Sequence, residues 1–92
     1  MNNVIIVAYD ISKNKTRTQF SKFLDKYGVR VQFSVYEIQN SKRVLDIVQN
    51  AIERKFKKKF EAGDSIYIFK TNLEDTIRYG SAGFIDKDLI FI

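Results

Sequence analysis

The sequence predicts a single α+β domain in which two helices cover one face of a mostly antiparallel sheet. Three observations lead to this fold class: an apolar run near the start of the chain, alternating polarity over residues 29–39, and two helical patterns placed between strand-like segments. The 92 residues contain no proline, repeat or low-complexity segment that would mark a linker. We therefore expect one domain over residues 1–92, with its core in residues 3–70 and a C-terminal segment, 71–92, for docking on a second copy or a partner.

The first two elements are a strand and a helix. Residues 4–9 form an unbroken apolar, mostly β-branched run, which predicts a strand buried on both faces at the centre of the sheet. Residues 13–27 show helical spacing, because apolar side chains recur at i, i+3, i+4 and i+7: Phe20, Phe23, Leu24 and Tyr27. Gly28 is the expected stop of this helix.

The remaining elements repeat the order of strand and helix. Residues 29–39 predict either one long bent strand or two short ones, and no Gly or Asn shows where a break would fall. Asn40 and Ser41 are expected to cap a helix over 42–60, which Gly63 ends. Residues 64–70 predict a third apolar strand, 71–87 a polar connection, and 89–92 a terminal strand. This order indicates a ferredoxin-like βαββαβ fold with an extra C-terminal strand.

Composition limits the chemistry and the partners. The chain has no cysteine and no histidine, which excludes thiolate and imidazole chemistry and leaves carboxylates, hydroxyls, Lys, Arg or an oxygen-bound metal ion. Sixteen Lys and Arg against eleven Asp and Glu give a net charge of +5, which indicates either a polyanionic partner or simple solubility. With 45% hydrophobic residues in so short a chain, we expect a homodimer.

The location expected from the sequence is the cytoplasm. The apolar stretch at residues 4–9 is too short for a signal-peptide core or a membrane span, and no basic residue precedes it. No membrane partner is therefore expected.

Asp10 is the first candidate for chemistry, because it stands where the first strand meets the first helix. A carboxylate beside hydroxyls at such a junction can hold Mg²⁺ that keeps several of its waters. On spacing alone, capping of the helix by Asp10 or Ser12 is the commoner role. A capping box is absent, because Lys15 follows Ser12 at the third position. Two Asp10 side chains that converge across a dimer axis would give a metal site two carboxylates.

Two groups of cations could bind a phosphate backbone. Lys13, Lys15 and Arg17 follow Asp10 closely, and residues 53–59 hold the densest charge of the chain, including Arg54, Lys55 and Lys58. The alternative for both groups is an ordinary solvated helix face, helped in the second case by the helix dipole. Among the aromatic residues, Tyr9, Phe33 and Tyr36 could stack on bases but are more often core or interface residues.

Two segments together resemble a family of CRISPR-associated proteins, the small dimeric subunit of the spacer-integration complex. The first is the strand end Val7-Ala8-Tyr9-Asp10-Ile11-Ser12, followed by a helix with Arg17. The second is Tyr27-Gly28 followed by Arg30-Val31-Gln32-Phe33-Ser34-Val35-Tyr36-Glu37. The resemblance spans residues 3–70 in order. The segment 71–87 departs from it, because it is longer and more acidic than the tails of compact members.

This resemblance implies a ferredoxin-like homodimer and a metal-dependent endonuclease that hydrolyses phosphodiester bonds in RNA or DNA. Asp10 would be its catalytic residue and the ligand of Mg²⁺ or Mn²⁺ at the dimer interface. The expected nucleic-acid-binding residues are Lys13, Lys15, Arg17, Arg30, Arg54, Lys55 and Lys58, with Tyr9, Ser12 and Ser34 in support.

The resemblance also implies an alternative without catalysis. The dimer would be a scaffold in CRISPR adaptation, binding protospacer duplex DNA and bridging dimers of the CRISPR integrase. Leu89–Ile92 would then swap onto the partner copy's sheet or dock on the integrase. A sequence-independent RNA-binding module is a third alternative, and it is disfavoured because the usual stacking signature is absent.

Overall fold

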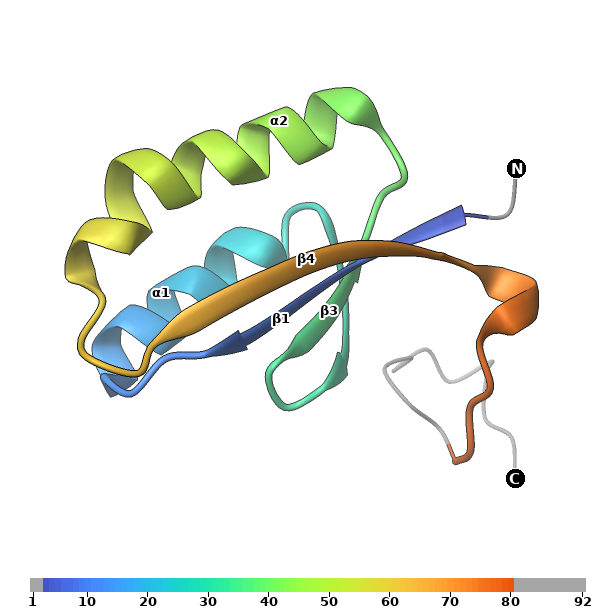
Figure 1. Ribbon diagram of the computed structural model, residues 1–92, viewed down its shortest axis with the longest axis horizontal. Helices are drawn as coiled ribbons and strands as arrows, with labels where there is room; N and C mark the ends of the chain where they lie inside the picture. The colour runs from blue at the N-terminus through green and yellow to red at the C-terminus, as the bar shows by residue number, and fades with distance from the viewer. Residues whose placement is uncertain (1–2, 81–92) are drawn as a thin grey trace.

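The sheet and the helices form two layers, with both helices on one face of the sheet (Figure 1). The computed structural model describes residues 3–80, so the predicted strand at 89–92 lies outside the described residues. In chain order the regular elements are β1 (Asn3–Asp10), α1 (Asn14–Leu24), β2 (Gly28–Gln32), β3 (Val35–Ile38), α2 (Lys42–Ala51), η1 (Ile52–Phe56), η2 (Lys57–Lys59), β4 (Ser65–Asn72) and η3 (Leu73–Asp75).

The four strands lie in the order β2-β3-β1-β4. Each neighbouring pair is antiparallel, although β1 and β2, like β3 and β4, are joined through helices. This arrangement is the ferredoxin-like α+β fold that the sequence predicts. The apolar strand β1 is central, as expected, and β4 runs beside its whole length from Asn3↔Asn72 to Asp10↔Ser65.

Alternation along β1 divides the two faces of the sheet. Ile5, Val7 and Tyr9 point towards the helices and are almost completely buried. They join a core contributed by every layer: Ile11, Phe20, Leu24, Tyr36, Ile38, Val44, Val48 and Phe56. The opposite face, here called the open face, carries Val4, Ile6 and Ala8 of β1 together with their cross-strand partners.

The first helix is shorter than the sequence predicts, and the assigned role of Gly28 is wrong. The helix ends at Leu24, and residues 25–27 form a turn. Gly28 is the first residue of β2 and not a left-handed helix stop, because only Gly63 and Gly80 have positive φ among the described residues. A Cβ at Gly28 would lie 2.1 Å from the carbonyl oxygen of Glu37. Glycine is required there by close strand contact.

Residues 29–39 form two strands rather than one bent strand. The turn between them is Phe33–Ser34, and the register shifts between Arg30 and Gln32. Neither turn residue has positive φ, so the turn needs no glycine or asparagine. This is why the sequence pattern does not locate the break.

The second helix begins as predicted and continues irregularly. The hydroxyl of Ser41 accepts a hydrogen bond from the backbone N–H of Val44 at 3.2 Å, which confirms the expected cap. The α-helix gives way to a π-turn at Ile52 and then to a 3₁₀ turn that ends at Lys59. Phe56 stays buried in the core through this change. Gly63, with φ of +92°, lies in the turn that leads into β4.

Candidate metal and nucleic-acid site

Asp10 is an exposed carboxylate at the end of the central strand. Its place in the alternation of β1 puts it on the open face, in line with Ile6 and Ala8. Within residues 3–80 its side chain has no hydrogen bond or ion pair. The helix-cap reading is wrong for both Asp10 and Ser12, because Lys13 is the N-cap residue of α1 and no side chain caps that helix. Asp10 is therefore available to an external ligand.

The segment after Asp10, residues 10–13, is here called the Asp10 turn. Ser12 does not cap α1, because its backbone N–H and its hydroxyl both donate to Asp64 Oδ1, at 3.0 and 2.9 Å. Asp64 Oδ2 accepts the backbone N–H of Glu61 at 2.9 Å. These bonds, the one from Glu61 first, lower the pKa of the Asp64 carboxyl. Lys13 forms an ion pair of 3.4 Å with Glu61.

Arg17 holds the Asp10 turn from the carbonyl side. One guanidinium nitrogen donates to the carbonyl oxygen of Ile11 at 2.9 Å and to that of Ser12 at 3.4 Å, and the other donates to the side chain of Asn14. Lys15 is exposed in the first turn of α1. The fold thus gathers all three predicted cations of this helix beside the Asp10 turn. Two of them, Lys13 and Arg17, are already bonded within the chain.

A polar hollow of about 340 Å³ lies between α1 and the β2–β3 turn. It combines cations, one carboxylate and two aromatic rings, and is lined by Tyr9, Arg17, Thr18, Ser21, Lys22, Asp25, Arg30 and Phe33. The ring of Phe33 is 72% exposed, and the Arg17 guanidinium lies 6.0 Å from its centroid. Phe33 therefore stays a candidate for base stacking.

Buried hydroxyls hold Arg30 in this hollow. Its guanidinium donates to Ser21 Oγ at 2.7 Å and lies over the Tyr36 ring, 5.7 Å from the centroid. The Tyr36 hydroxyl bonds Ser21 Oγ at 2.8 Å and donates to Asp25 at 2.6 Å. The interaction of the Arg30 guanidinium with the Tyr36 side chain is the main cause that raises the pKa of Arg30. Arg17, Ser21 and Asp25 follow one another at i, i+4 and i+8, a spacing that could have revealed this face of α1.

Tyr9 and Tyr36 are core residues and not stacking platforms. Both are buried, and their rings pack against each other with centroids 6.4 Å apart. Burial raises the pKa of Tyr9, which keeps its hydroxyl protonated near neutral pH. Ser34, which the sequence selects as a supporting site residue, contacts Tyr9 through the backbone. The Tyr9 N–H donates to the Ser34 carbonyl at 3.0 Å.

The second group of cations lies where the second helix ends. Arg54, Lys55 and Lys58 are exposed, and Lys55 lies 5.1 Å from the centroid of the Phe56 ring. Lys59, which the sequence reading did not select, donates to the side chain of Gln19 at 2.9 Å. That bond ties the end of the second helix to α1. The start of α1, the end of β1 and the start of β4 lie at this same end of the molecule (Figure 1).

A single chain does not enclose a metal ion within the part that the structure describes. No group of three acidic, His or Cys side chains lies together there. Mg²⁺ commonly uses only one or two carboxylates with waters and substrate phosphates, so an unpartnered Asp10 suits such a site if a second copy supplies another oxygen ligand. Among the described helices, none is long and apolar enough to cross a membrane.

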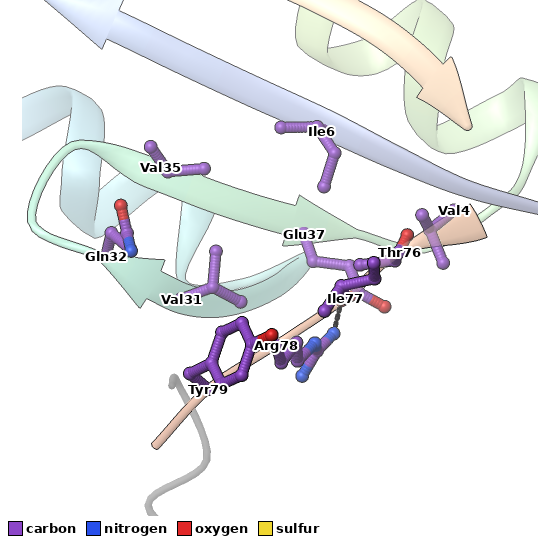
Figure 2. Close-up of a pocket in the computed structure, with 10 residues that line it drawn as sticks. All are labelled: Val4, Ile6, Val31, Gln32, Val35, Glu37, Thr76, Ile77, Arg78 and Tyr79. Carbon is purple, nitrogen blue, oxygen red and sulfur yellow. Dashed lines mark hydrogen bonds and ion pairs between the residues drawn. The ribbon is translucent and has the colours of Figure 1, made fainter. Parts of the chain in front are cut away.

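A second hollow, of about 320 Å³, lies on the open face away from the Asp10 turn. Figure 2 shows it between the sheet and the segment after η3, lined by Val4, Ile6, Val31, Gln32, Val35, Glu37, Thr76, Ile77, Arg78 and Tyr79. Arg78 forms an ion pair of 2.7 Å with Glu37. This pair fixes residues 76–79 over one part of the open face. Tyr67 and Phe69 of β4 do not line this hollow and remain 69% and 49% exposed.

Comparisons with known proteins agree on one family. The family model described as CRISPR associated protein Cas2 matches residues 3–77. A protein of Francisella tularensis subsp. novicida named CRISPR-associated endoribonuclease Cas2 1 is 37% identical over 83 residues, which cover 89% of this chain and 81% of that one. CRISPR-associated endoribonuclease Cas2 4 of Rhodospirillum rubrum is 46% identical over 43 residues, 47% of this chain and only 35% of its own length.

A solved structure supports the fold independently. The crystal structure titled cas2 superposes with a TM-score of 0.69 at 21% identity, and the match covers 97% of this chain and 99% of that one. At this identity the likeness concerns the fold alone.

Proposed function

From the premise that the chain belongs to the CRISPR-associated Cas2 family, we propose that it is a metal-dependent nuclease that hydrolyses phosphodiester bonds in RNA or DNA as a homodimer. The observation that carries the proposal is the Asp10 carboxylate, exposed at the end of the central strand and without a partner among residues 3–80. The nearby carboxylates of Asp64 and Glu61 are bonded within the chain. Among the described carboxylates at this junction, Asp10 alone is therefore available to a metal.

The open face supports the dimer. Phe69 and Tyr67 are large apolar side chains left 49% and 69% exposed on it, and Asp10 lies at its edge. Burial of such side chains against a second copy is favourable by about 1.5–3 kcal/mol for each fully buried ring. Two copies packed through this face would bring their Asp10 residues towards each other. Such a pair would hold Mg²⁺ or Mn²⁺, which activates water and neutralises charge on the phosphate.

The cations would position the nucleic acid. Lys15 is exposed beside the Asp10 turn, and Arg30 and Phe33 lie in the adjoining polar hollow. Contacts of this kind to phosphates fix the register of a backbone without reading its sequence. Because Arg17 donates to the carbonyls of the Asp10 turn, its role in this proposal is to hold the turn as well as to face the backbone. The proposal retains the cytoplasmic location expected from the sequence.

A non-catalytic scaffold in CRISPR adaptation is the second candidate. The observation that favours it is the separate group of exposed cations at the end of the second helix, Arg54, Lys55 and Lys58. A hydrolytic site would not need so broad a basic surface, whereas a dimer that binds protospacer duplex and bridges CRISPR integrase dimers would. Asp10 would then have no chemical role.

A nuclease assay separates the two candidates. Purified protein would be incubated with single-stranded RNA and with duplex DNA in Mg²⁺, Mn²⁺ or EDTA, beside an Asp10→Ala variant purified identically. The proposal predicts cleavage that requires the metal and disappears in the variant. Equal cleavage by both proteins, or none by either, would contradict the nuclease proposal and favour the scaffold. Arg54→Glu with Lys58→Glu serves as the converse test, since the scaffold predicts loss of duplex binding in that variant.

A further inference from the structure

The Asp10 turn has little support of its own. It follows the last pair of the β1–β4 ladder, Asp10↔Ser65, and precedes a helix whose N-terminus no side chain caps. Ser12 and Lys13 are exposed, and no described core residue other than Ile11 belongs to the turn. Without outside contacts, the backbone that carries Asp10 would be free to move at this point.

Asp64 supplies the contact on one side of the turn. It precedes Ser65, so it lies one residue beyond the ladder on the opposite strand. Its Oδ1 takes both donors of Ser12, at 3.0 and 2.9 Å, across 52 residues of sequence. Its Oδ2 takes the N–H of Glu61 at 2.9 Å, and its own N–H donates to the Glu61 carbonyl at 3.0 Å. Both oxygens are therefore used, and the side chain is fixed in its own turn before it reaches Ser12.

Arg17 holds the Asp10 turn on the other side, and Asp64 and Arg17 together are here called the clamp. The Ser12 residue has its N–H on Asp64 and its carbonyl oxygen within 3.4 Å of the Arg17 guanidinium. A group held at both its donor and its acceptor has little freedom to rotate, so the strand end before it is held as well. Lys13 adds a second link to the same loop through Glu61.

We infer that Asp64 is a positioning residue that fixes the Asp10 turn, and through it the direction in which the Asp10 carboxylate meets a metal ion. The inference rests on the proposed function for its consequence, but the contacts that carry it belong to this chain alone. Groups that orient a metal ligand typically change metal affinity by about 10–100-fold when they are removed. Asp64 would act in that way without touching the metal.

Three variants separate positioning from simple support of the fold. Asp64→Ala removes all the side-chain bonds. Asp64→Asn leaves one side-chain oxygen, which can accept either from Ser12 or from the Glu61 N–H but not from both. Asp46→Ala is the matched control, because Asp46 is an exposed aspartate whose bond, 3.3 Å to Lys42, lies within α2. Each protein would be titrated with Mn²⁺ by calorimetry, and its thermal unfolding would be recorded beside the titration.

The inference predicts Mn²⁺ binding about 10-fold weaker in Asp64→Ala, a smaller loss in Asp64→Asn, and none in Asp46→Ala. A smaller loss in Asp64→Asn than in Asp64→Ala supports the inference, because one side-chain oxygen is enough to accept from Ser12. Unchanged Mn²⁺ affinity in Asp64→Ala, with only a lower unfolding temperature, would overturn the inference and leave Asp64 as a structural residue.

A readout without metal keeps the inference separate from the proposed function. Exchange of the Ser12 amide hydrogen would be measured by NMR in the metal-free wild type and in Asp64→Ala. Faster exchange in the variant supports the clamp, and equal exchange overturns it. A wild type that binds no Mn²⁺ at all would contradict the proposed function, and the amide exchange would then decide the role of Asp64 by itself.

Discussion

The two faces of the sheet differ in what covers them. On the helix face, Val7 and Tyr36 are completely buried beneath the helices. On the open face, Phe69 and Tyr67 are 49% and 69% exposed, and only the segment 76–79 crosses part of the surface within residues 3–80. The helix face therefore holds the core that stabilises one chain, whereas the open face, with Asp10 at its edge, leaves apolar side chains exposed for the proposed second copy.

The largest effect is expected on the helix face. Phe56 is 1% exposed and packs on the rings of Phe20 and Phe23, with centroids 4.9 and 5.7 Å away. Phe56→Ala should lower the free energy of unfolding by about 3–5 kcal/mol, because it removes a buried ring and leaves a cavity. Urea unfolding measures it. Phe33→Ala is the control, since that ring is 72% exposed, and its effect should stay within about 0.5 kcal/mol. Similar losses in both variants would contradict the assignment of Phe56 to the stabilising core.

The next effect concerns the open face. Phe69→Asp should leave the chain folded but raise the dissociation constant of the proposed dimer by about 100-fold or more, because a buried ring is lost and a charge must be desolvated. Light scattering over a range of concentrations gives the constant, and circular dichroism checks the fold. Phe33→Asp places the same charge on another exposed phenylalanine and should not change the constant. A dimer that survives Phe69→Asp would remove the open face as its interface.

A smaller effect is expected from one hydroxyl in the core. Tyr36→Phe removes the hydroxyl that bonds Ser21 and Asp25. Ser21, which accepts from Arg30, then loses its bond to this hydroxyl. The free energy of unfolding should fall by about 1–2 kcal/mol, since Ser21 is left buried with fewer partners. Tyr67→Phe is the matched control, because that hydroxyl belongs to a side chain on the open face that is 69% exposed. Equal stability of Tyr36→Phe and the wild type would show that the network contributes nothing.

The smallest effect is on pH dependence. The pKa of Asp64 is lowered in the folded protein by the N–H of Glu61 and the donors of Ser12, whereas an aspartate in the unfolded chain has a pKa of about 3.9. The clamp therefore adds stability above about pH 4 and loses it as the pH falls further, when the folded carboxyl takes up a proton. Urea unfolding of the wild type and of Asp64→Ala should show a difference that shrinks below about pH 4. A difference that grows towards acid would contradict the assignment.

Much of the fold follows from the sequence, because apolar periodicity is strong in β1 and in both helices. The parts that do not follow depend on contacts distant in the chain. The local pattern predicts that Gly28 ends a helix, yet glycine is needed there because the Glu37 carbonyl on the neighbouring strand leaves no room for a Cβ. The Phe33–Ser34 turn has no glycine to mark it. The register that places these residues side by side is not visible in any local pattern.

The candidate site divides in the same way. Asp10 could be selected from its position at a strand end, and Arg17 and Arg30 from charge and resemblance, and these assignments stay predictions about function. Asp64 could not be predicted as a site residue from the sequence, because its bond to Ser12 spans 52 residues and the residues around it predict the start of a strand. The Ser12 hydroxyl donates to Asp64 and accepts no backbone N–H of α1, so the expected helix cap at Ser12 is wrong.

The proposed function requires that two copies, joined through the open face, share one metal ion between their Asp10 residues. The stoichiometry of Mn²⁺ binding, measured by native mass spectrometry on the wild type and on Asp10→Ala, tests it most directly. We expect one Mn²⁺ for each pair of wild-type chains and none in the variant. One ion for each chain, or the same binding in Asp10→Ala, would contradict it.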